Sequence, residues 1–335
     1  MPIAPVEPEL RPANVALGMT VYNGERYLPE ALDSILSQEH RDFTLVVLDD
    51  YSADRSPEIL SDRASRNPEM LCFRNVRRNG MVATWERVFR LSQLYCPGHQ
   101  YFGWCSDHDL LEPNWLALLA DILNRRAEAV MAYPETLHID AEGHLLGKPR
   151  SPRRFSTYGL EDPLARFKYA IRQLSGAGDM IYGLMRSAAL DAIGVYRPVL
   201  QPDRLALMEL SLIGQIHQVP KILRYRRVTA PASIGRQKTS LFDPSGPKRR
   251  TWLPWYIMHA ITFFQAYGSR SAPESQFSRQ QVFGLSVSIL YSQFRADLEK
   301  KLLRSKRALE WFGKRTFKPF WRRTLRPLWH SVRIR

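Results

Sequence analysis

The sequence has few cysteines and no long apolar run. Its three cysteines, Cys72, Cys96 and Cys105, show no spacing typical of a metal site. Their odd number and wide separation favour a reducing compartment, and we expect Cys72 and Cys105 to be small buried side chains in strands. No stretch is apolar for long enough to span a membrane as a helix. The first residues, MPIAPVEPELRP, have no apolar signal core, so we expect no secretory signal.

Acidic residues are nearly absent from residues 300–335. Glu310 stands there among thirteen lysines and arginines, so this tail holds +12 of the net charge of +15 and the body is close to neutral. Six Trp and Phe side chains between Trp311 and Trp329 are interleaved with the cations. This combination is typical of a segment at an anionic membrane surface. Single-stranded nucleic acid is bound by the same residue types and is the competing interpretation.

Apolar runs and helical stripes alternate through the first 133 residues. We predict strands at 15–21, 43–48, 70–73, 101–105 and 129–133, and helices at 25–38, 57–65, 80–94 and 113–125. This alternation predicts an α/β fold, with a mostly parallel sheet flanked by helices. Gly-x-Gly-x-x-Gly does not follow the first strand, which argues against a nicotinamide cofactor.

Polar clusters follow three of the predicted strands. They are Tyr22-Asn23, Asp49-Asp50 and Asp107-His108-Asp109. Because the carboxyl ends of parallel strands meet at one edge of a sheet, we expect these clusters to converge. Two carboxylates one residue apart need a positive partner, and a divalent cation carrying a diphosphate is suitable. The alternative is that each acid only caps the next helix, as expected for Asp54, with Asp109 capping the helix at Pro113.

Four ordered blocks resemble family 2 glycosyltransferases of the GT-A fold. They are VALGMTVYNGERYLPEALDSILSQ, FTLVVLDDYSAD, the Asp107/Asp109 pair and QPDRLALMELSLIGQIHQVPKILRYRR. The resemblance covers roughly residues 14–235 and implies an inverting, nucleotide-sugar-dependent enzyme. We therefore divide the chain into an irregular arm (1–13), a GT-A domain (14–240) and a helical, basic-aromatic extension (241–335). In the extension we expect the segment 251–268 to form a helix packed on the domain, a further helix at 280–301, and helix breaks at Pro319 and Pro327. Within the domain, 14–110 is the nucleotide-binding half and 111–240 the acceptor half.

The resemblance also implies which residues bind the sugar donor. They are Thr20, Tyr22, Asp49, Asp50, Arg78, Asp107 and Asp179. A carboxylate such as Asp50 can accept the imide N–H of uracil or thymine, so we expect a UDP or dTDP sugar. Arg78 and its neighbours Arg74 and Arg77 can contact phosphate, or can form a solvated basic loop.

Asp107 and Asp109 are the implied ligands of a Mg²⁺ or Mn²⁺ that stabilises charge on the leaving nucleoside diphosphate. Relatives often carry a further His ligand after the Arg pair that matches Arg226-Arg227. This sequence has no histidine at that place, so a third protein ligand is not predicted. His108 inside the motif can reach a phosphate or act only as a spacer.

Asp203 is the implied general base that takes the proton of the acceptor hydroxyl. Its alternative role is an N-cap of the helix that it opens, and Glu209 is the alternative base. The expected acceptor is a cell-surface or lipid-linked glycan in polysaccharide biosynthesis. With the basic tail, this predicts a cytoplasmic hexosyltransferase held peripherally on the inner membrane face, with no nucleic-acid partner. The alternative function is a non-catalytic nucleotide-sugar or nucleic-acid binding protein with a basic tail.

Overall fold

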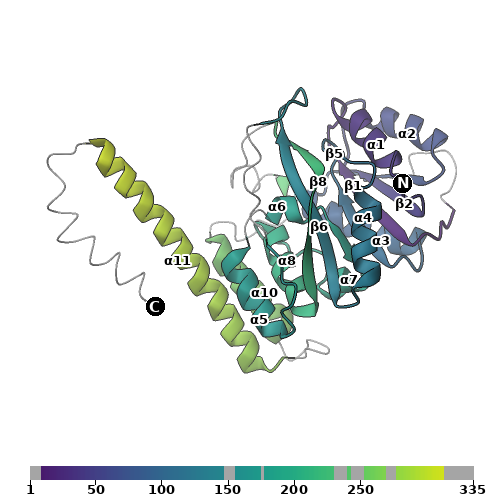
Figure 1. The fold of residues 1–335 in the computed structure, drawn as a ribbon. Coiled ribbons are helices and arrows are strands. Elements are labelled where there is room, and N and C mark those ends of the chain that lie inside the picture. The colour runs from purple at the N-terminus through teal and green to yellow at the C-terminus, as the bar shows by residue number, and fades with distance from the viewer. Residues whose placement is uncertain are drawn as a thin grey trace, which may run out of the picture.

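The computed structural model describes residues 9–146, 155–174, 177–229, 240–242, 253–268 and 277–312. Of residues 296, 297 and 300–312 it describes the backbone alone. Most of the predicted N-terminal arm and the tail beyond 312, with its expected helix breaks at Pro319 and Pro327, lie outside these ranges. One eight-stranded sheet runs through the molecule, with helices on both of its faces (Figure 1). Within the described ranges, none of the helices has the length and apolarity required to cross a bilayer.

The first half of the sheet is parallel. Its strands are β1 (Val15–Val21), β2 (Phe43–Asp49), β3 (Met70–Arg74) and β4 (Tyr101–Cys105), in the order β3-β2-β1-β4. The connections carry α1 (Leu28–Leu36), α2 (Ser56–Arg66) and α3 (Met81–Tyr95). β1, β2 and β4 are covered on both faces, which is why they are continuous apolar runs in the sequence. The predicted α/β fold is confirmed here.

The second half of the sheet is mixed, which departs from an all-parallel arrangement. After α4 (Trp115–Arg125) it contains β6 (Ala129–Ile139), β7 (Leu184–Arg186), β8 (Gln215–Arg227) and the short β5 (Leu110–Leu111). β7 pairs antiparallel with both β4 and β6, and β5 pairs antiparallel with β8. β5 and β7 are two and three residues long, too short to give a periodic pattern in the sequence.

Two apolar layers cover the sheet. Along β1, Val15, Leu17 and Met19 face the layer that holds α1 and α4, whereas Ala16 faces the layer that holds α3. This alternation follows from the two-residue period of a strand. Cys72, Cys96 and Cys105 are all buried in these layers without disulfides, as expected for the first and last of them.

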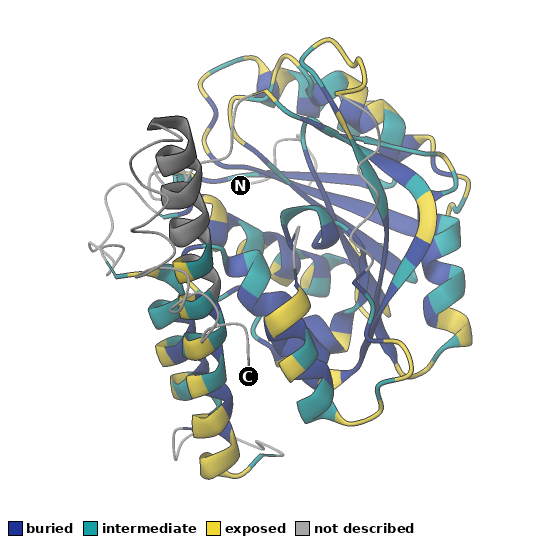
Figure 2. Ribbon diagram, turned by 60° about the vertical axis from the view of Figure 1, so that its left-hand side comes forward, coloured by how far each residue is buried: buried dark blue, intermediate teal, exposed yellow. Residues whose placement is uncertain are grey.

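The remaining helices pack on the second half of the sheet and on one another. They are α5 (Pro163–Gln173), α6 (Ala177–Met180), α7 (Ser187–Ala192), α8 (Pro202–Ile213), α10 (Trp255–Gly268) and α11 (Arg279–Phe312). α10 packs on the body as expected, with the ring of Phe263 4.9 Å from that of Phe167 in α5. α11 extends past the predicted 280–301, and buried and exposed residues alternate along its described part (Figure 2).

Candidate active site

A pocket of about 340 Å³ opens at the carboxyl ends of β1 and β4, beside the loop that follows β2. Its size is at the lower end of the range usual for small-molecule sites. Five of the predicted donor residues line it, namely Thr20, Tyr22, Asp50, Arg78 and Asp107. Trp85, His108 and Tyr182 also line it. The three polar clusters therefore converge on one cavity, because their parallel strands end at the same edge.

Asp50 holds a loop against the pocket. Its carboxylate accepts hydrogen bonds from Asn75 Nδ2 at 2.7 Å, from the Asn79 backbone N–H at 2.9 Å and from the Gly80 N–H at 3.0 Å. A carboxylate has about four acceptor positions, so one is left for a ligand. Asp50 thus fixes the loop that carries Arg78 and still presents an acceptor to the pocket.

Asp49 lies behind Asp50 and outside the pocket lining. Its fully buried carboxylate accepts from the Ser52 N–H at 3.1 Å and forms an ion pair with Arg74 Nε at 3.0 Å. Burial raises its pKa, although Ser52 and Arg74 oppose the shift. The structure gives Asp49 a supporting position in the β2 turn.

Arg78 and Tyr22 form one wall of the pocket. The guanidinium carbon of Arg78 lies 4.1 Å from the centre of the Tyr22 ring, a cation–π distance. Among the described residues, Arg78 Nε is buried and has no hydrogen-bond partner. A buried donor without a partner is costly, so a bound acceptor such as a phosphate oxygen would relieve it.

Asp107 and His108 form the acidic end of the pocket. His108 Nδ1 lies 2.6 Å from Asp107 Oδ1 and 3.1 Å from Ser106 Oγ. Burial alone would lower the pKa of His108, but the hydrogen bond and charge of Asp107 outweigh it and raise the pKa. Gly24 leaves room for this carboxylate, because a Cβ there would lie 2.9 Å from Asp107 Oδ2.

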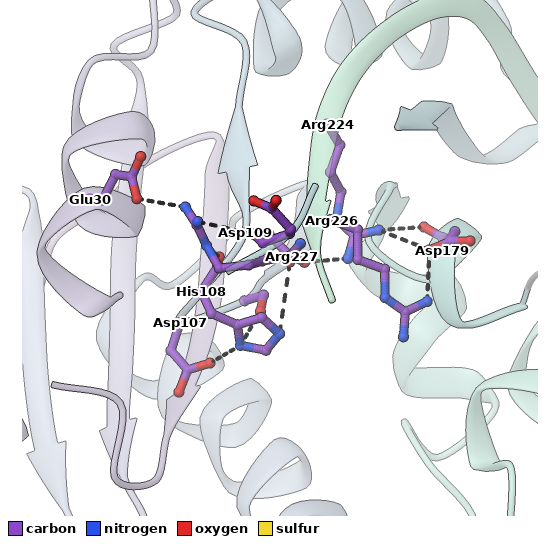
Figure 3. Close-up of polar contacts among 10 residues, drawn as sticks. Glu30, Asp107, His108, Asp109, Asp179, Arg224, Arg226 and Arg227 are labelled. Carbon is purple, nitrogen blue, oxygen red and sulfur yellow. Dashed lines mark hydrogen bonds and ion pairs between the residues drawn. The ribbon is translucent and has the colours of Figure 1, made fainter. Parts of the chain in front are cut away.

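Asp109 turns away from the pocket and binds β8 (Figure 3). Its carboxylate pairs with the buried Arg224 guanidinium and accepts from the Arg227 backbone N–H at 2.8 Å. Burial by itself would raise the pKa of Asp109, but Arg224 outweighs burial and the pKa is lowered. Asp109 therefore does not cap the helix near Pro113; the N-cap of α4 is Asn114. Asp54 does hold the next helix, since it accepts from the Ser56 N–H.

A network of charges extends from Asp109 along β8 (Figure 3). Arg226 donates to Asp179 Oδ1 at 2.8 Å, and Arg224 Nη1 lies 3.7 Å from the same oxygen. Arg224 also lies 4.1 Å from the ring centre of Tyr182, which lines the pocket. Asp179 is consequently linked to the pocket through Arg224 and Tyr182, and does not line it.

Asp203 lies beside this network, in the first turn of α8. A Cβ on Gly178 would meet Asp203 Oδ2 at 3.5 Å and Arg226 Nη1 at 3.6 Å. Burial raises the pKa of Asp203, which suits a group that must take up a proton. The N-cap of α8 is Gln201, so the N-cap interpretation of Asp203 is wrong. Glu209 is fully buried and pairs with Arg197 at 3.1 Å.

The donor set has room for a cation that arrives with a diphosphate. In the described ranges, no three His, Cys, Asp or Glu side chains gather to bind a metal by themselves. Mg²⁺ and Mn²⁺ need only one or two protein carboxylates when phosphate oxygens supply the rest, and Asp107 faces the pocket. Asp109 fits less well, because the buried Arg224 beside it repels a cation.

Sequence reasoning missed Arg224, Tyr182 and Trp85 and undervalued His108. The signal for Arg224 is its spacing from Arg226, since residues two apart on a strand share one face. Two basic residues on one face of a strand next to a buried sheet indicate a buried acidic partner. Nothing local to Tyr182 or Trp85 indicates a pocket.

Residues 17–172 match the family described as "Glycosyl transferase family 2". Over this segment, which is a little under half of the chain, the sequence is similar to family 2 glycosyltransferases. An uncharacterised glycosyltransferase of Rickettsia typhi is 27% identical over 148 residues, 44% of each chain. Chondroitin synthase of Escherichia coli is 26% identical over 132 residues, 39% of this chain and 18% of that protein. The chain thus matches less than half the length of these curated relatives.

Solved glycosyltransferase structures share the fold of this chain. Residues 1–349 of TarS from S. aureus, in complex with UDP-GlcNAc, superpose with a TM-score of 0.57 at 15% identity, covering 84% of this chain and 72% of that one. The mannosyltransferase PcManGT from Pyrobaculum calidifontis, with GDP-Man and Mn²⁺, superposes with a TM-score of 0.52 at 13% identity, covering 98% and 86%. These likenesses establish the GT-A fold.

Proposed function

We propose that this protein is an inverting glycosyltransferase. It moves a sugar from a nucleoside-diphosphate sugar to a hydroxyl of a glycan. The observation that carries this proposal is the convergence of Thr20, Tyr22, Asp50, Arg78 and Asp107 on one pocket from separate parts of the chain. Two solved structures with this fold are complexes with UDP-GlcNAc and with GDP-Man, which supports a nucleotide-sugar donor.

We propose that the nucleotide lies between the Tyr22–Arg78 wall and Asp50. The free acceptor position of Asp50 suits the imide N–H of uracil or thymine, which favours a UDP or dTDP sugar. Arg78 Nε, which lacks a partner among the described residues, would donate to a phosphate oxygen. Asp49 and Asp179 would act by holding Arg74 and Arg226 in place.

We propose that Asp107 holds a Mg²⁺ or Mn²⁺ with the donor, and PcManGT, crystallised with Mn²⁺, supports this choice of cation. The cation would stabilise the negative charge that builds on the departing diphosphate. Asp109 remains a predicted ligand, but it would reach the cation only after Arg224 releases it.

Asp203 would act as the base in a single displacement. The acceptor oxygen forms a bond to the anomeric carbon while the bond from that carbon to the phosphate oxygen breaks. The hydroxyl proton passes to an Asp203 oxygen, and the electron pair of the broken bond leaves on the nucleoside diphosphate. One base on the side opposite the leaving group gives inversion at the anomeric carbon.

The acceptor and the location are proposed from the tail. We infer a cell-surface or lipid-linked glycan as acceptor and peripheral attachment to the cytoplasmic face of the membrane. The +12 charge of residues 300–335 and their Trp and Phe side chains support this location.

A thermal-shift screen of the full-length protein tests the donor proposal. UDP, dTDP and GDP sugars are compared, each with and without Mn²⁺. A true donor stabilises the fold by mass action, by about 2.7 kcal/mol at a concentration of 100 Kd. Stabilisation by a UDP or dTDP sugar that requires Mn²⁺ is expected, followed by turnover with a glycan acceptor. Binding without any turnover would favour the non-catalytic alternative, and stabilisation by none of them would overturn the proposal.

A further inference from the structure

A second cleft, of about 880 Å³, lies between α5, α8 and α11, outside the donor pocket. Four basic side chains, Lys168, Arg172, Arg204 and Arg295, and one acidic side chain, Glu299, line it. Glu299 pairs with Arg295 at 3.1 Å. Within the described part of the chain, Lys168 and Arg172 form no ion pair. The cleft therefore carries an excess of positive charge open to solvent.

Arg204 provides a buried donor at this cleft. Its Nε is buried and has no hydrogen-bond partner among the described residues. Burial lowers the pKa of the guanidinium, although Asp203 opposes the shift. Because an unpaired buried donor costs free energy, an anion bound in the cleft would be stabilised by pairing with it. Arg204 also adjoins Asp203, so this cleft and the proposed base share the first turn of α8.

The outer face of α11 continues from the cleft as an apolar stripe. Phe283, Val287, Tyr291, Phe294 and Leu298 follow one another at intervals of four, four, three and four residues, so they share one helix face. Each of them is more than a third exposed, and Tyr291 is 65% exposed. Val287 and Tyr291 line both the stripe and the cleft. Val282, Leu285 and Ile289 fill the opposite face and pack on the body.

We propose that the cleft and the stripe together form a docking site for a bilayer that contains anionic phospholipid. The phosphate of a lipid headgroup would occupy the basic cleft, and the stripe would lie among the acyl chains at the interface. α11 runs alongside α10 and α5 and continues beyond the body (Figure 1), and its sequence leads directly into the basic, aromatic tail. The site thus extends the proposed membrane contact of the tail to a folded surface near Asp203.

A second copy of the chain is the main competing occupant. A parallel pairing of two α11 helices would bring two tails of charge +12 together, which repel each other. An anionic bilayer instead matches both the charge of the cleft and the apolarity of the stripe. Charge complementarity therefore favours the bilayer.

Vesicle co-sedimentation with full-length protein tests the site. Phosphatidylcholine vesicles with and without phosphatidylglycerol are compared for the wild type and two double variants, Lys168→Gln with Arg172→Gln and Phe283→Ser with Tyr291→Ser. Two lost charges should weaken binding to the anionic vesicles about thirtyfold. Loss of the two aromatic anchors should weaken it about tenfold or more.

Matched controls remove equivalent groups elsewhere on the surface. Arg66→Gln with Arg125→Gln removes two exposed charges, and Leu10→Ser with Leu94→Ser removes two exposed apolar side chains. Both should bind within about twofold of the wild type, and all variants should retain the donor-induced thermal shift. If the wild type shows no donor-induced thermal shift, that result contradicts the proposed glycosyltransferase function and not the membrane site.

Three results would overturn the proposal. If both site variants bind anionic vesicles as tightly as the wild type does, the cleft and the stripe do not contact the membrane, and the tail is the contact. Equal sedimentation of the wild type with neutral and anionic vesicles would remove the phosphate site. A dimer in sedimentation equilibrium that Phe283→Ser with Tyr291→Ser dissociates would assign the stripe to a second copy.

Discussion

Asp203 lies in the first turn of α8, close to Arg226, and is the proposed base. Asp203→Asn keeps the size of the side chain but cannot accept the proton, so kcat should fall about 10²–10⁴-fold. The donor Kd, measured by calorimetry, should change little. Glu209→Gln is the matched control, because Glu209 pairs with Arg197 and should affect stability more than kcat. If Glu209→Gln lowers kcat in this way and Asp203→Asn does not, Glu209 is the base.

The pH dependence of kcat should show the same base. Burial raises the pKa of Asp203, and the base works only when ionised. Turnover should therefore be full above this raised pKa and fall as the pH drops through it, at a higher pH than an ordinary aspartate would give. A pH–rate profile of Asp203→Asn should lack this acidic limb. An unchanged limb in that variant would assign it to another group.

Asp107 and Asp109 have different surroundings, which separates their roles experimentally. Asp107 faces the pocket, so Asp107→Asn should leave the unliganded protein stable within about 1 kcal/mol and remove the Mn²⁺-dependent shift with UDP. Melting curves with UDP, with and without Mn²⁺, measure both effects. Full activity of the wild type in excess EDTA would contradict any metal role.

Among the secondary-structure elements, β8 is joined to the acidic motif at residues 107–109 by the ion pair between Asp109 and Arg224. Both side chains are at least 96% buried, so removing one leaves an uncompensated buried charge. Asp109→Asn and Arg224→Met should each lower the free energy of unfolding by about 3–5 kcal/mol. Chemical denaturation measures these losses.

A double-mutant cycle on the same pair gives the control. The variant with both substitutions removes both charges and should lose less stability than the sum of the single variants, by about 1–3 kcal/mol. Additive losses would show that the two residues act independently. Such a result would also leave Asp109 available as a metal ligand.

The bounds of some strands and helices follow from the local sequence more completely than those of others. β1, β2 and β4 are covered on both faces, so their continuous apolar runs identify them. β6 extends to Ile139, beyond the predicted 129–133, because its second half pairs with β8 and is only partly buried. α11 likewise runs to Phe312 in place of residue 301, since the sequence there contains no helix breaker.

On the scale of the whole molecule, charge is concentrated in residues 300–335. Each basic residue near an anionic surface contributes about 1 kcal/mol, so Arg322→Gln with Arg323→Gln should weaken binding to anionic vesicles about thirtyfold. High salt should weaken wild-type attachment without abolishing it, since apolar contacts are not screened. Co-sedimentation at several salt concentrations measures both, with Arg66→Gln and Arg125→Gln as the control.

Competition with single-stranded nucleic acid provides the contrary test for the tail. If an oligonucleotide binds the full-length protein more tightly than anionic vesicles do, the basic segment is a nucleic-acid contact. The domain boundaries at 13, 110 and 240 also remain predictions. Limited proteolysis, which cleaves exposed linkers first, would test them.

That Tyr22, Asp50 and Asp107 meet at one place could be predicted from the amino-acid sequence alone. Each follows an apolar run typical of a buried parallel strand, and such strands end at one edge of the sheet. The resemblance to family 2 glycosyltransferases then indicated sugar transfer as the reaction.

Which of the acidic side chains face the pocket depends on the pairing of distant strands. Asp109 is one residue from His108 but binds Arg224, 115 positions later, because β5 pairs with β8 and brings Arg224 behind the motif. Asp49, next to Asp50, pairs with Arg74, which lies opposite it on the neighbouring strand β3. The partner of a buried charge is set by strand pairing and register, which no local spacing records.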